Sequence, residues 1–201
     1  MNALENWNRL TFLSWNAGLS TPAWHLWLAS AAANYLIYLI PVALTAMWCW
    51  GGRTRRESAL KICVLAALSL GINQLIAIVY PHPRPFEIGL GHTFIQHAAD
   101  SSFPSDHATI FAAMAIGMLS TNAKSLTGWF MLAAGACVAW ARIYLGVHYP
   151  LDMLGAIGVV AATSLALSPV WRAHGPGWTA RAEKLYHLVL AWPISHGWIR
   201  R

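Results

Sequence analysis

Three short stretches of this 201-residue chain contain polar residues whose types and spacing suit chemistry on a phosphate group. They are Pro83-Arg84-Pro85, Pro104-Ser105-Asp106-His107, and the segment that runs from Arg142 through His148 to Asp152. Only 10% of the residues are charged, whereas 57% are hydrophobic. Ionisable side chains at the ends of long apolar segments are costly to keep there, so we interpret them as functional.

Cleavage of a phosphate ester or anhydride requires cations that hold the non-bridging oxygens, a nucleophile, and an acid for the leaving oxygen. Arg84 and Arg142 have planar guanidinium groups that match phosphate geometry. Ser105 adds a hydroxyl and a backbone donor at the expected start of a helix. We predict that these three residues bind the phosphate.

His148 and Asp152 are four residues apart and therefore share one face of a helix. The carboxylate can accept the Nδ1 proton, which leaves Nε2 as a free and oriented nucleophile. His107 is then available as the proton donor to the leaving oxygen. We predict these three residues as catalytic.

Two other interpretations apply to the same residues. His107, His148 and Asp152 could form a metal site with nitrogen and oxygen ligands, but the neighbouring arginines would repel a cation. Arg142 taken alone is typical of an anchor at a membrane interface. The joint spacing favours catalysis, and two arginines with two helix N-termini would make a metal or another cofactor unnecessary for neutralising the phosphate.

The mean hydropathy of +0.47 and the 12 tryptophans indicate an integral membrane protein. Formal charges are absent from residues 22–52, 62–83, 107–123, 125–141 and 153–171. An apolar helix needs roughly 20 residues to cross a bilayer, and about 17 at the short end. We predict an all-α, polytopic bundle of about five transmembrane helices that forms a single domain over residues 1–201, with its core motifs in 83–152.

The two ends of the chain differ from these runs. Residues 4–19 place apolar side chains near helical spacing, which predicts an amphipathic helix that lies at the membrane interface. Residues 172–201 combine tryptophans with basic residues, which predicts an amphipathic tail in the cytoplasmic headgroup zone.

The charge distribution predicts the orientation of the chain. Segments 51–61, 122–126 and 170–201 together carry a net charge of +8, and segments 1–21, 84–106 and 142–152 carry −2, which gives the formal +6. The positive-inside rule places the basic side in the cytoplasm and the motifs on the outer side. Anionic lipid headgroups, and not nucleic acid, are the expected partners of these basic residues.

Prolines mark two expected helix starts on the outer side. Pro104 and Pro150 each come just before an apolar run, a position that suits the first turn of a helix. Ser105 or Asp106 is then a natural N-cap, and His148 lies at the opening of the last span. Two helix N-termini facing the same side would offer a binding site for an anion.

The three stretches resemble the three-part signature of the type 2 phosphatidic acid phosphatase (PAP2) superfamily. The third part reads ARIYLGVHYPLD over 141–152, and the run HAADSSFPSDH over 97–107 resembles bacterial bacitracin-resistance undecaprenyl-diphosphate phosphatases in particular. The resemblance implies that His148 is the nucleophile, Asp152 its orienting partner and His107 the general acid. It also implies that Arg84, Ser105 and Arg142 hold the phosphate without a metal.

The chain departs from the signature at three positions. The lysine seven residues before Arg84 is replaced by Ala77, the glycine before His107 by Asp106, and the serine before Arg142 by Ala141. His82 and His97 are the candidates to supply the missing cation. The Asp106 carboxylate would be unfavourable near a phosphate unless it faces away.

The resemblance implies a phosphatase of the bacterial inner membrane that removes the terminal phosphate of a polyprenyl diphosphate at the outer leaflet. Such an enzyme returns the lipid carrier to peptidoglycan synthesis and confers bacitracin resistance. One alternative is a broader lipid phosphatase acting on phosphatidic acid or phosphatidylglycerophosphate. Another, from a different class, is a non-catalytic polyprenyl-lipid binder or flippase.

Overall fold

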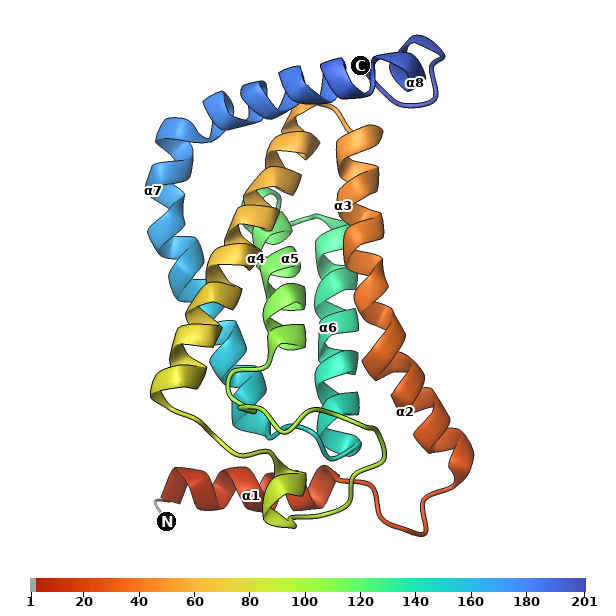
Figure 1. Cartoon of the computed structure of the whole chain (residues 1–201), viewed down its shortest axis with the longest axis vertical. Coiled ribbons are helices and arrows are strands. Elements are labelled where there is room, and N and C mark those ends of the chain that lie inside the picture. Colours follow the sequence, from red (N-terminus) through yellow and green to blue (C-terminus); the bar gives the residue numbers. More distant parts are fainter. Residues whose placement is uncertain (1–2) are drawn as a thin grey trace.

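The computed structural model describes residues 3–201, and every regular element in that range is helical (Figure 1). The elements are α1 (Ala3–Trp15), α2 (Ala23–Tyr35), η1 (Leu36–Tyr38), α3 (Leu39–Cys49), α4 (Arg53–Val79), η2 (Pro85–Ile88), α5 (Asp106–Thr121), α6 (Leu126–Tyr144), α7 (Pro150–Val189) and α8 (Ala191–Ser195). The prediction of an all-α membrane bundle is confirmed.

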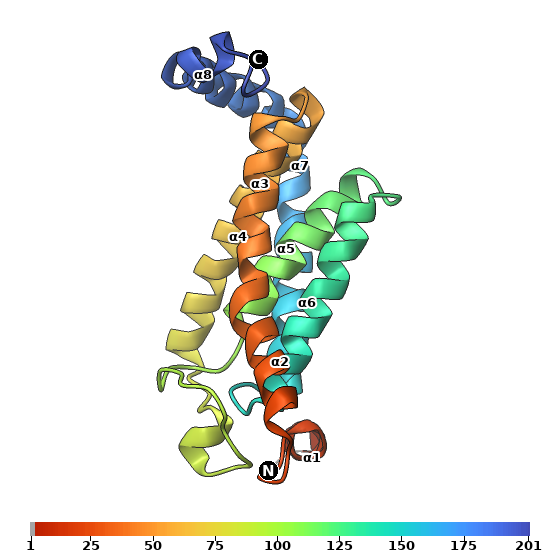
Figure 2. The same ribbon diagram turned by 90° about the vertical axis from the view of Figure 1, so that its right-hand side faces the viewer.

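Four helical segments of the described chain are long and apolar enough to cross a membrane: 23–49, 53–79, 126–144 and 150–189. The predicted span 107–123, the third in chain order, forms α5, which has only 16 residues. At 1.5 Å per residue α5 is roughly 24 Å long, shorter than a hydrocarbon core of about 30 Å. It contacts α3, α4, α6 and α7 and lies inside the bundle (Figure 2).

Small residues allow α5 to occupy this central position. Phe111 and Met114 of α5 belong to a buried cluster with Ile62 of α4 and Val138 of α6. A side chain at Gly135 of α6 would bring its Cβ within 2.8 Å of the Phe111 Cβ. The close packing of α5 against α6 therefore depends on glycine at that position.

Helix α1 lies across one end of the bundle, beside the connection that contains η2 (Figure 1). Its buried residues are Asn8 and Phe12; the Asn8 side-chain oxygen accepts a hydrogen bond from the Leu151 amide at 3.0 Å. Its exposed face carries Leu4, Trp7, Leu10, Leu13 and Trp15. The helix predicted over 4–19 is therefore present over 3–15, with an apolar face free to contact lipid.

Helix α7 does not end where the apolar run ends. It continues through Pro169 and Pro176 to Val189, and its second half turns to lie across the end of the bundle opposite α1 (Figure 1). Proline lacks a backbone N–H and breaks the helical ladder locally, which accounts for bending of such a helix. The predicted tail 172–201 thus begins as a continuation of the last span.

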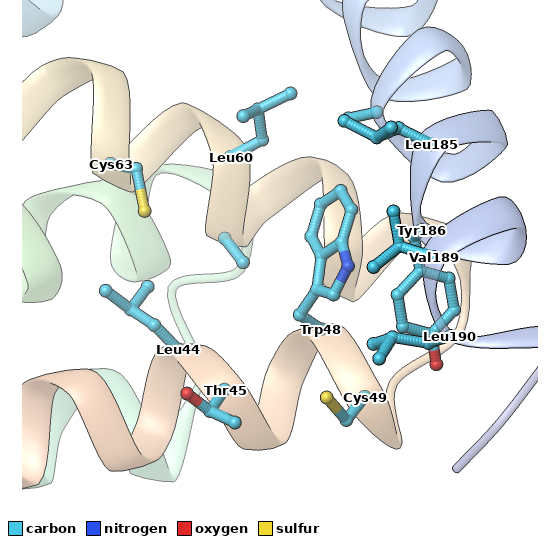
Figure 3. Close-up of a pocket in the computed structure, with 12 residues that line it drawn as sticks. Leu44, Thr45, Trp48, Cys49, Leu60, Cys63, Leu185, Tyr186, Val189 and Leu190 are labelled. Atoms are coloured by element: carbon cyan, nitrogen blue, oxygen red, sulfur yellow. The ribbon is translucent and has the colours of Figure 1, made fainter. Parts of the chain in front are cut away.

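An apolar cavity of about 590 Å³ lies beneath this second half of α7 (Figure 3). Leu44 and Trp48 of α3, Leu60 of α4, and Leu185 and Tyr186 of α7 are among its lining residues. The cavity is at the end of the bundle opposite α1 and the three sequence motifs (Figure 1).

Candidate active site

The three motif segments meet at the end of the bundle that α1 covers. Their polar side chains line a cavity of about 280 Å³. Residues of the motifs and of the long connection that line it are Arg84, His97, Asp100, Ser101, Phe103, Pro104, Asp106, His107, Arg142 and His148. Helix α4 completes the wall with Asn73, Gln74 and Ala77.

The starts of α5 and α7 are joined at this cavity. Ser105 is the N-cap of α5, and its hydroxyl accepts a hydrogen bond from the Ala108 amide at 3.5 Å. The Ser105 amide donates to the carbonyl of Asp152 in the first turn of α7 at 3.2 Å. The cap predicted at Ser105 is present, and two helix N-termini face the same end, as the proline positions indicated.

His148 and Asp152 form a buried pair. His148 Nδ1 lies 3.1 Å from Asp152 Oδ2, and the side chains are only 3% and 1% exposed. The same oxygen accepts the Tyr149 amide at 2.8 Å, which fixes the carboxylate. A carboxylate can only accept, so Nδ1 carries the proton and Nε2 has the lone pair.

Burial, and after it the nearby Arg84 cation, lower the pKa of His148 well below its ordinary value. The imidazole is therefore neutral near pH 7. Arg84 Nη1 lies 3.1 Å from His148 Nε2, in agreement with a lone pair on that atom. The geometry and the pKa give the same protonation state.

Arg84 is buried, yet its guanidinium reaches an exposed carboxylate. Nη1 donates to the Val147 carbonyl at 2.8 Å, while Nε and Nη2 lie 2.9 and 2.8 Å from Oδ1 of Asp100. The Asp100 side chain is 62% exposed. Asp100, which the sequence analysis did not single out, occupies the Nε–Nη2 edge of the guanidinium. A phosphate oxygen could bind at the same edge.

Arg142 is 3% exposed and donates from Nη1 to the Ala33 carbonyl of α2 at 3.3 Å. An interfacial anchor would extend its guanidinium to the headgroups, so that interpretation of Arg142 is wrong. Its Nε is buried and has no hydrogen-bond partner among residues 3–201. Arg142 also lines the cavity, together with His107 of α5.

The structure separates the two histidines considered as substitutes for the missing lysine. His97 lines the cavity, and its ring centre is 6.1 Å from that of His148. Burial lowers the pKa of His97, so it is a hydrogen-bonding group more than a fixed cation. His82 is not among the residues that line this cavity. Its Nδ1 lies 2.9 Å from the Ser102 hydroxyl.

Asp106 lines the cavity, and amides of α4 hold its carboxylate. Its carboxylate accepts hydrogen bonds from Asn73 Nδ2 at 2.9 Å and Gln74 Nε2 at 3.3 Å. Asn73 also donates to Thr109 at 2.8 Å and is buried. Asn73 and Gln74 line the cavity from α4, as does Ala77. Sequence reasoning missed Asn73, because nothing local distinguishes one amide in an apolar helix.

Comparisons with known proteins agree with the fold and the motifs. Residues 58–174 match the PAP2 superfamily. The chain is 36% identical to "Putative undecaprenyl-diphosphatase YbjG" of Escherichia coli (strain K12), over 98% of this chain and 99% of that one. It is 42% identical to undecaprenyl-diphosphatase BcrC of Bacillus subtilis (strain 168), over 63% and 64% of the two chains.

Solved structures show the same fold at lower identity. The crystal structure of Aquifex aeolicus LpxE matches with a TM-score of 0.65 and 18% identity, over 80% of this chain and 93% of that one. A transmembrane PAP2-type phosphatidylglycerolphosphate phosphatase from Bacillus subtilis matches with a TM-score of 0.63 and 17% identity, over 86% and 88%. The helical architecture, the motif spacing and the match over 58–174 together establish that the chain belongs to the PAP2 superfamily.

Proposed function

We propose that this protein is an undecaprenyl-diphosphate phosphatase that removes the terminal phosphate of the lipid carrier through a phosphohistidine intermediate. The observation that carries the proposal is the geometry of His148. Asp152 Oδ2 lies 3.1 Å from His148 Nδ1, which leaves the lone pair on Nε2. Nε2 lies beside Arg84 in a polar cavity. The similarity to undecaprenyl-diphosphatases along nearly the whole chain supports the choice of substrate.

In the first step, Nε2 of His148 attacks the terminal phosphorus. The bond from that phosphorus to the bridging oxygen breaks, and His107 donates a proton to the leaving lipid monophosphate. Burial lowers the pKa of His107 to about 4, and the negative charge of the bound diphosphate favours its protonated form. The imidazole gains positive charge as the N–P bond forms, and the Asp152 carboxylate on Nδ1 stabilises that charge.

In the second step, a water molecule attacks the phosphohistidine. His107, now neutral, accepts a proton from this water, and the N–P bond breaks to release inorganic phosphate. His148 returns to its starting tautomer. The two steps leave both histidines in the protonation states in which they began.

Charge on the phosphoryl oxygens is stabilised by groups already present. Arg84 and Arg142 supply guanidinium groups, Ser105 a hydroxyl, and the start of α5 its first-turn amides. His97 is placed to donate one further hydrogen bond. These donors make a divalent metal unnecessary for charge neutralisation. Asp100 must release the edge of Arg84 when the phosphate binds.

The charge split between the two ends supports an outward-facing site. The motif end carries a net charge of −2 and the other end +8, so the positive-inside rule places the cavity at the outer leaflet of the bacterial cytoplasmic membrane. The product would be a polyprenyl monophosphate, and its recycling would lower the amount of diphosphate that bacitracin can bind.

The test compares phosphate release by the purified protein from undecaprenyl diphosphate and from phosphatidic acid in the same detergent or bilayer. We expect kcat/KM to be higher for undecaprenyl diphosphate. A higher value for phosphatidic acid would reject the proposed substrate in favour of a broader lipid phosphatase. No phosphate release from either would reject enzymatic function and favour a lipid binder or flippase.

A further inference from the structure

A series of polar contacts leads away from the His148–Asp152 pair through two residues that do not line the cavity, Ser102 and His82. Ser102 is fully buried and interacts with the Asp152 carboxylate. Asp152 Oδ1 is buried, and no donor among residues 3–201 meets full hydrogen-bond geometry with it. The other neighbour of the Ser102 hydroxyl is His82, whose Nδ1 lies 2.9 Å away. A buried carboxylate oxygen without a donor requires an explanation.

His82 joins this serine to the interfacial helix α1. His82 Nε2 lies 3.7 Å from Oε2 of Glu5, and Glu5 is itself paired with Arg9 at 2.6 Å. The His82 ring packs edge-on against Tyr149 at 5.2 Å between centres and stacks with Tyr80 at 6.0 Å. Glu5, Arg9 and the two tyrosines are thus the titratable groups that face His82 from the packed elements.

The backbone fixes His82 relative to the serine. The Ser102 amide donates to the His82 carbonyl at 2.8 Å, and the His82 amide donates to the Ser101 hydroxyl at 3.1 Å. The His82 side chain is 14% exposed. The imidazole therefore has little freedom to turn away from Ser102.

Counting protons on this chain shows two arrangements. With a single proton on His82 Nε2, directed at Glu5, Nδ1 must accept the Ser102 proton, and Asp152 Oδ1 receives nothing. With a proton on His82 Nδ1, this nitrogen donates to Ser102, and the Ser102 proton is free for Asp152 Oδ1.

We propose that His82 is a positioning residue that, through Ser102, supplies the second hydrogen bond to the Asp152 carboxylate. With its proton on Nδ1, 2.9 Å from the Ser102 hydroxyl, it lets Ser102 hold Asp152 as an oriented anion. No proton moves along the chain during turnover. The proposal rests on His148 being the nucleophile of the proposed phosphatase, and not on the identity of the lipid.

Two substitutions of His82 distinguish the roles of its two ring nitrogens. In His82→Asn the side-chain amide takes the place of Nδ1 and can donate to Ser102, whereas in His82→Gln it takes the place of Nε2 and reaches only Glu5. We expect kcat to fall roughly ten-fold in His82→Gln, with KM unchanged, and to stay within about three-fold of wild type in His82→Asn. His196→Gln, on an exposed residue after α8, is the matched control.

A double-mutant cycle tests whether His82 acts through Ser102. Ser102→Ala removes the hydroxyl that His82 is proposed to direct, so His82→Gln should cause no further loss of kcat in that background. Losses that add in the double variant would overturn the proposal. So would equal losses in His82→Gln and His82→Asn, or an unchanged kcat in His82→Gln.

A measurement without turnover keeps this inference separate from the proposed function. In purified protein labelled with ¹⁵N-histidine, the proton on His148 Nδ1 reports its hydrogen bond to Asp152. We expect its resonance to shift in Ser102→Ala and His82→Gln but not in His82→Asn. If undecaprenyl diphosphate is not hydrolysed but the resonance shifts as stated, the substrate is wrong and the positioning role stands. An unchanged resonance in Ser102→Ala overturns the positioning role.

Discussion

Buried arginines occur at both ends of the bundle, and their partners distinguish them. Arg84 at the motif end is 4% exposed and Arg56 at the other end is 3% exposed. Arg56 donates to the carbonyls of Trp48 at 2.9 Å and Arg200 at 2.6 Å, and its guanidinium lies 4.6 Å from the centre of the Tyr186 ring. It ties the C-terminal segment to α3.

Arg84 uses its donors differently. It contacts the exposed carboxylate of Asp100 and the lone pair of His148 Nε2, groups that a phosphate can displace. Burial of a charged side chain therefore does not by itself identify a functional site. The exposure of the acidic partner does. Arg56 also pairs with Glu183, whose side chain is 16% exposed, whereas the Asp100 side chain that holds Arg84 is 62% exposed and can be exchanged for a substrate anion.

At the motif end, the largest loss of activity is expected from substitution of Asp152. Asp152→Asn keeps the shape of the side chain but presents an amide to Nδ1, so the tautomer with a free Nε2 is lost. We expect kcat to fall by about 10⁴, by analogy with the same change in serine proteases. The assay is phosphate release at equal protein concentration. Activity within ten-fold of wild type would show that the carboxylate does not orient His148.

A pair of identical substitutions at the two arginines sharpens the comparison directly. Arg84→Lys should lower kcat/KM by about 10²–10³, because an ammonium group cannot replace the two-pronged contact with the phosphate. Arg56→Lys should leave kcat/KM nearly unchanged and lower the free energy of unfolding by about 1–3 kcal/mol. Activity and thermal unfolding are measured on both. The reverse pattern would contradict the distinction drawn between them.

The pH dependence follows from the lowered pKa of His148. A histidine with a lowered pKa loses its proton at a lower pH, so the nucleophile is neutral at pH 7 and stays neutral as the pH falls through 6.5, its ordinary pKa. We expect the acid limb of kcat/KM to lie below pH 6.5. Arg84→Gln removes a cation next to Nε2 and should move that limb towards neutral pH. A limb that moves to lower pH would contradict the electrostatic argument.

The smallest effect is expected from removal of divalent metals. Because two guanidinium groups and the start of α5 already line the cavity, EDTA should leave most of the activity intact. Activity is measured after dialysis against chelator and again after addition of Mg²⁺ or Zn²⁺. Complete loss that a metal restores would reassign His107, His148 and Asp152 as ligands.

The sequence allowed prediction of features that depend on local pattern. The apolar runs gave the helices, and the fixed spacing between His148 and Asp152 gave their contact, because residues four apart share a helix face. The N-cap at Ser105 followed from its residue type and the adjacent proline.

Features that depend on contacts between distant segments were missed. Local pattern did not show that α5 is too short to span a bilayer on its own, or that α7 continues through Pro169 and Pro176. It also did not reveal that Asp100 pairs with Arg84, since the two residues are sixteen positions apart, with η2 and irregular chain between them. Tertiary packing decides such pairings, and the periodicity of apolar residues does not predict them.

The most direct test of the central claim is a search for the covalent intermediate. Wild-type protein and variants at equal expression are mixed with ³²P-labelled substrate, quenched, and examined for acid-labile label on the protein. We predict label on wild type, retained label in His107→Ala when the leaving group is good, and none in His148→Ala. Label that persists in His148→Ala would contradict the assignment of His148 as the nucleophile.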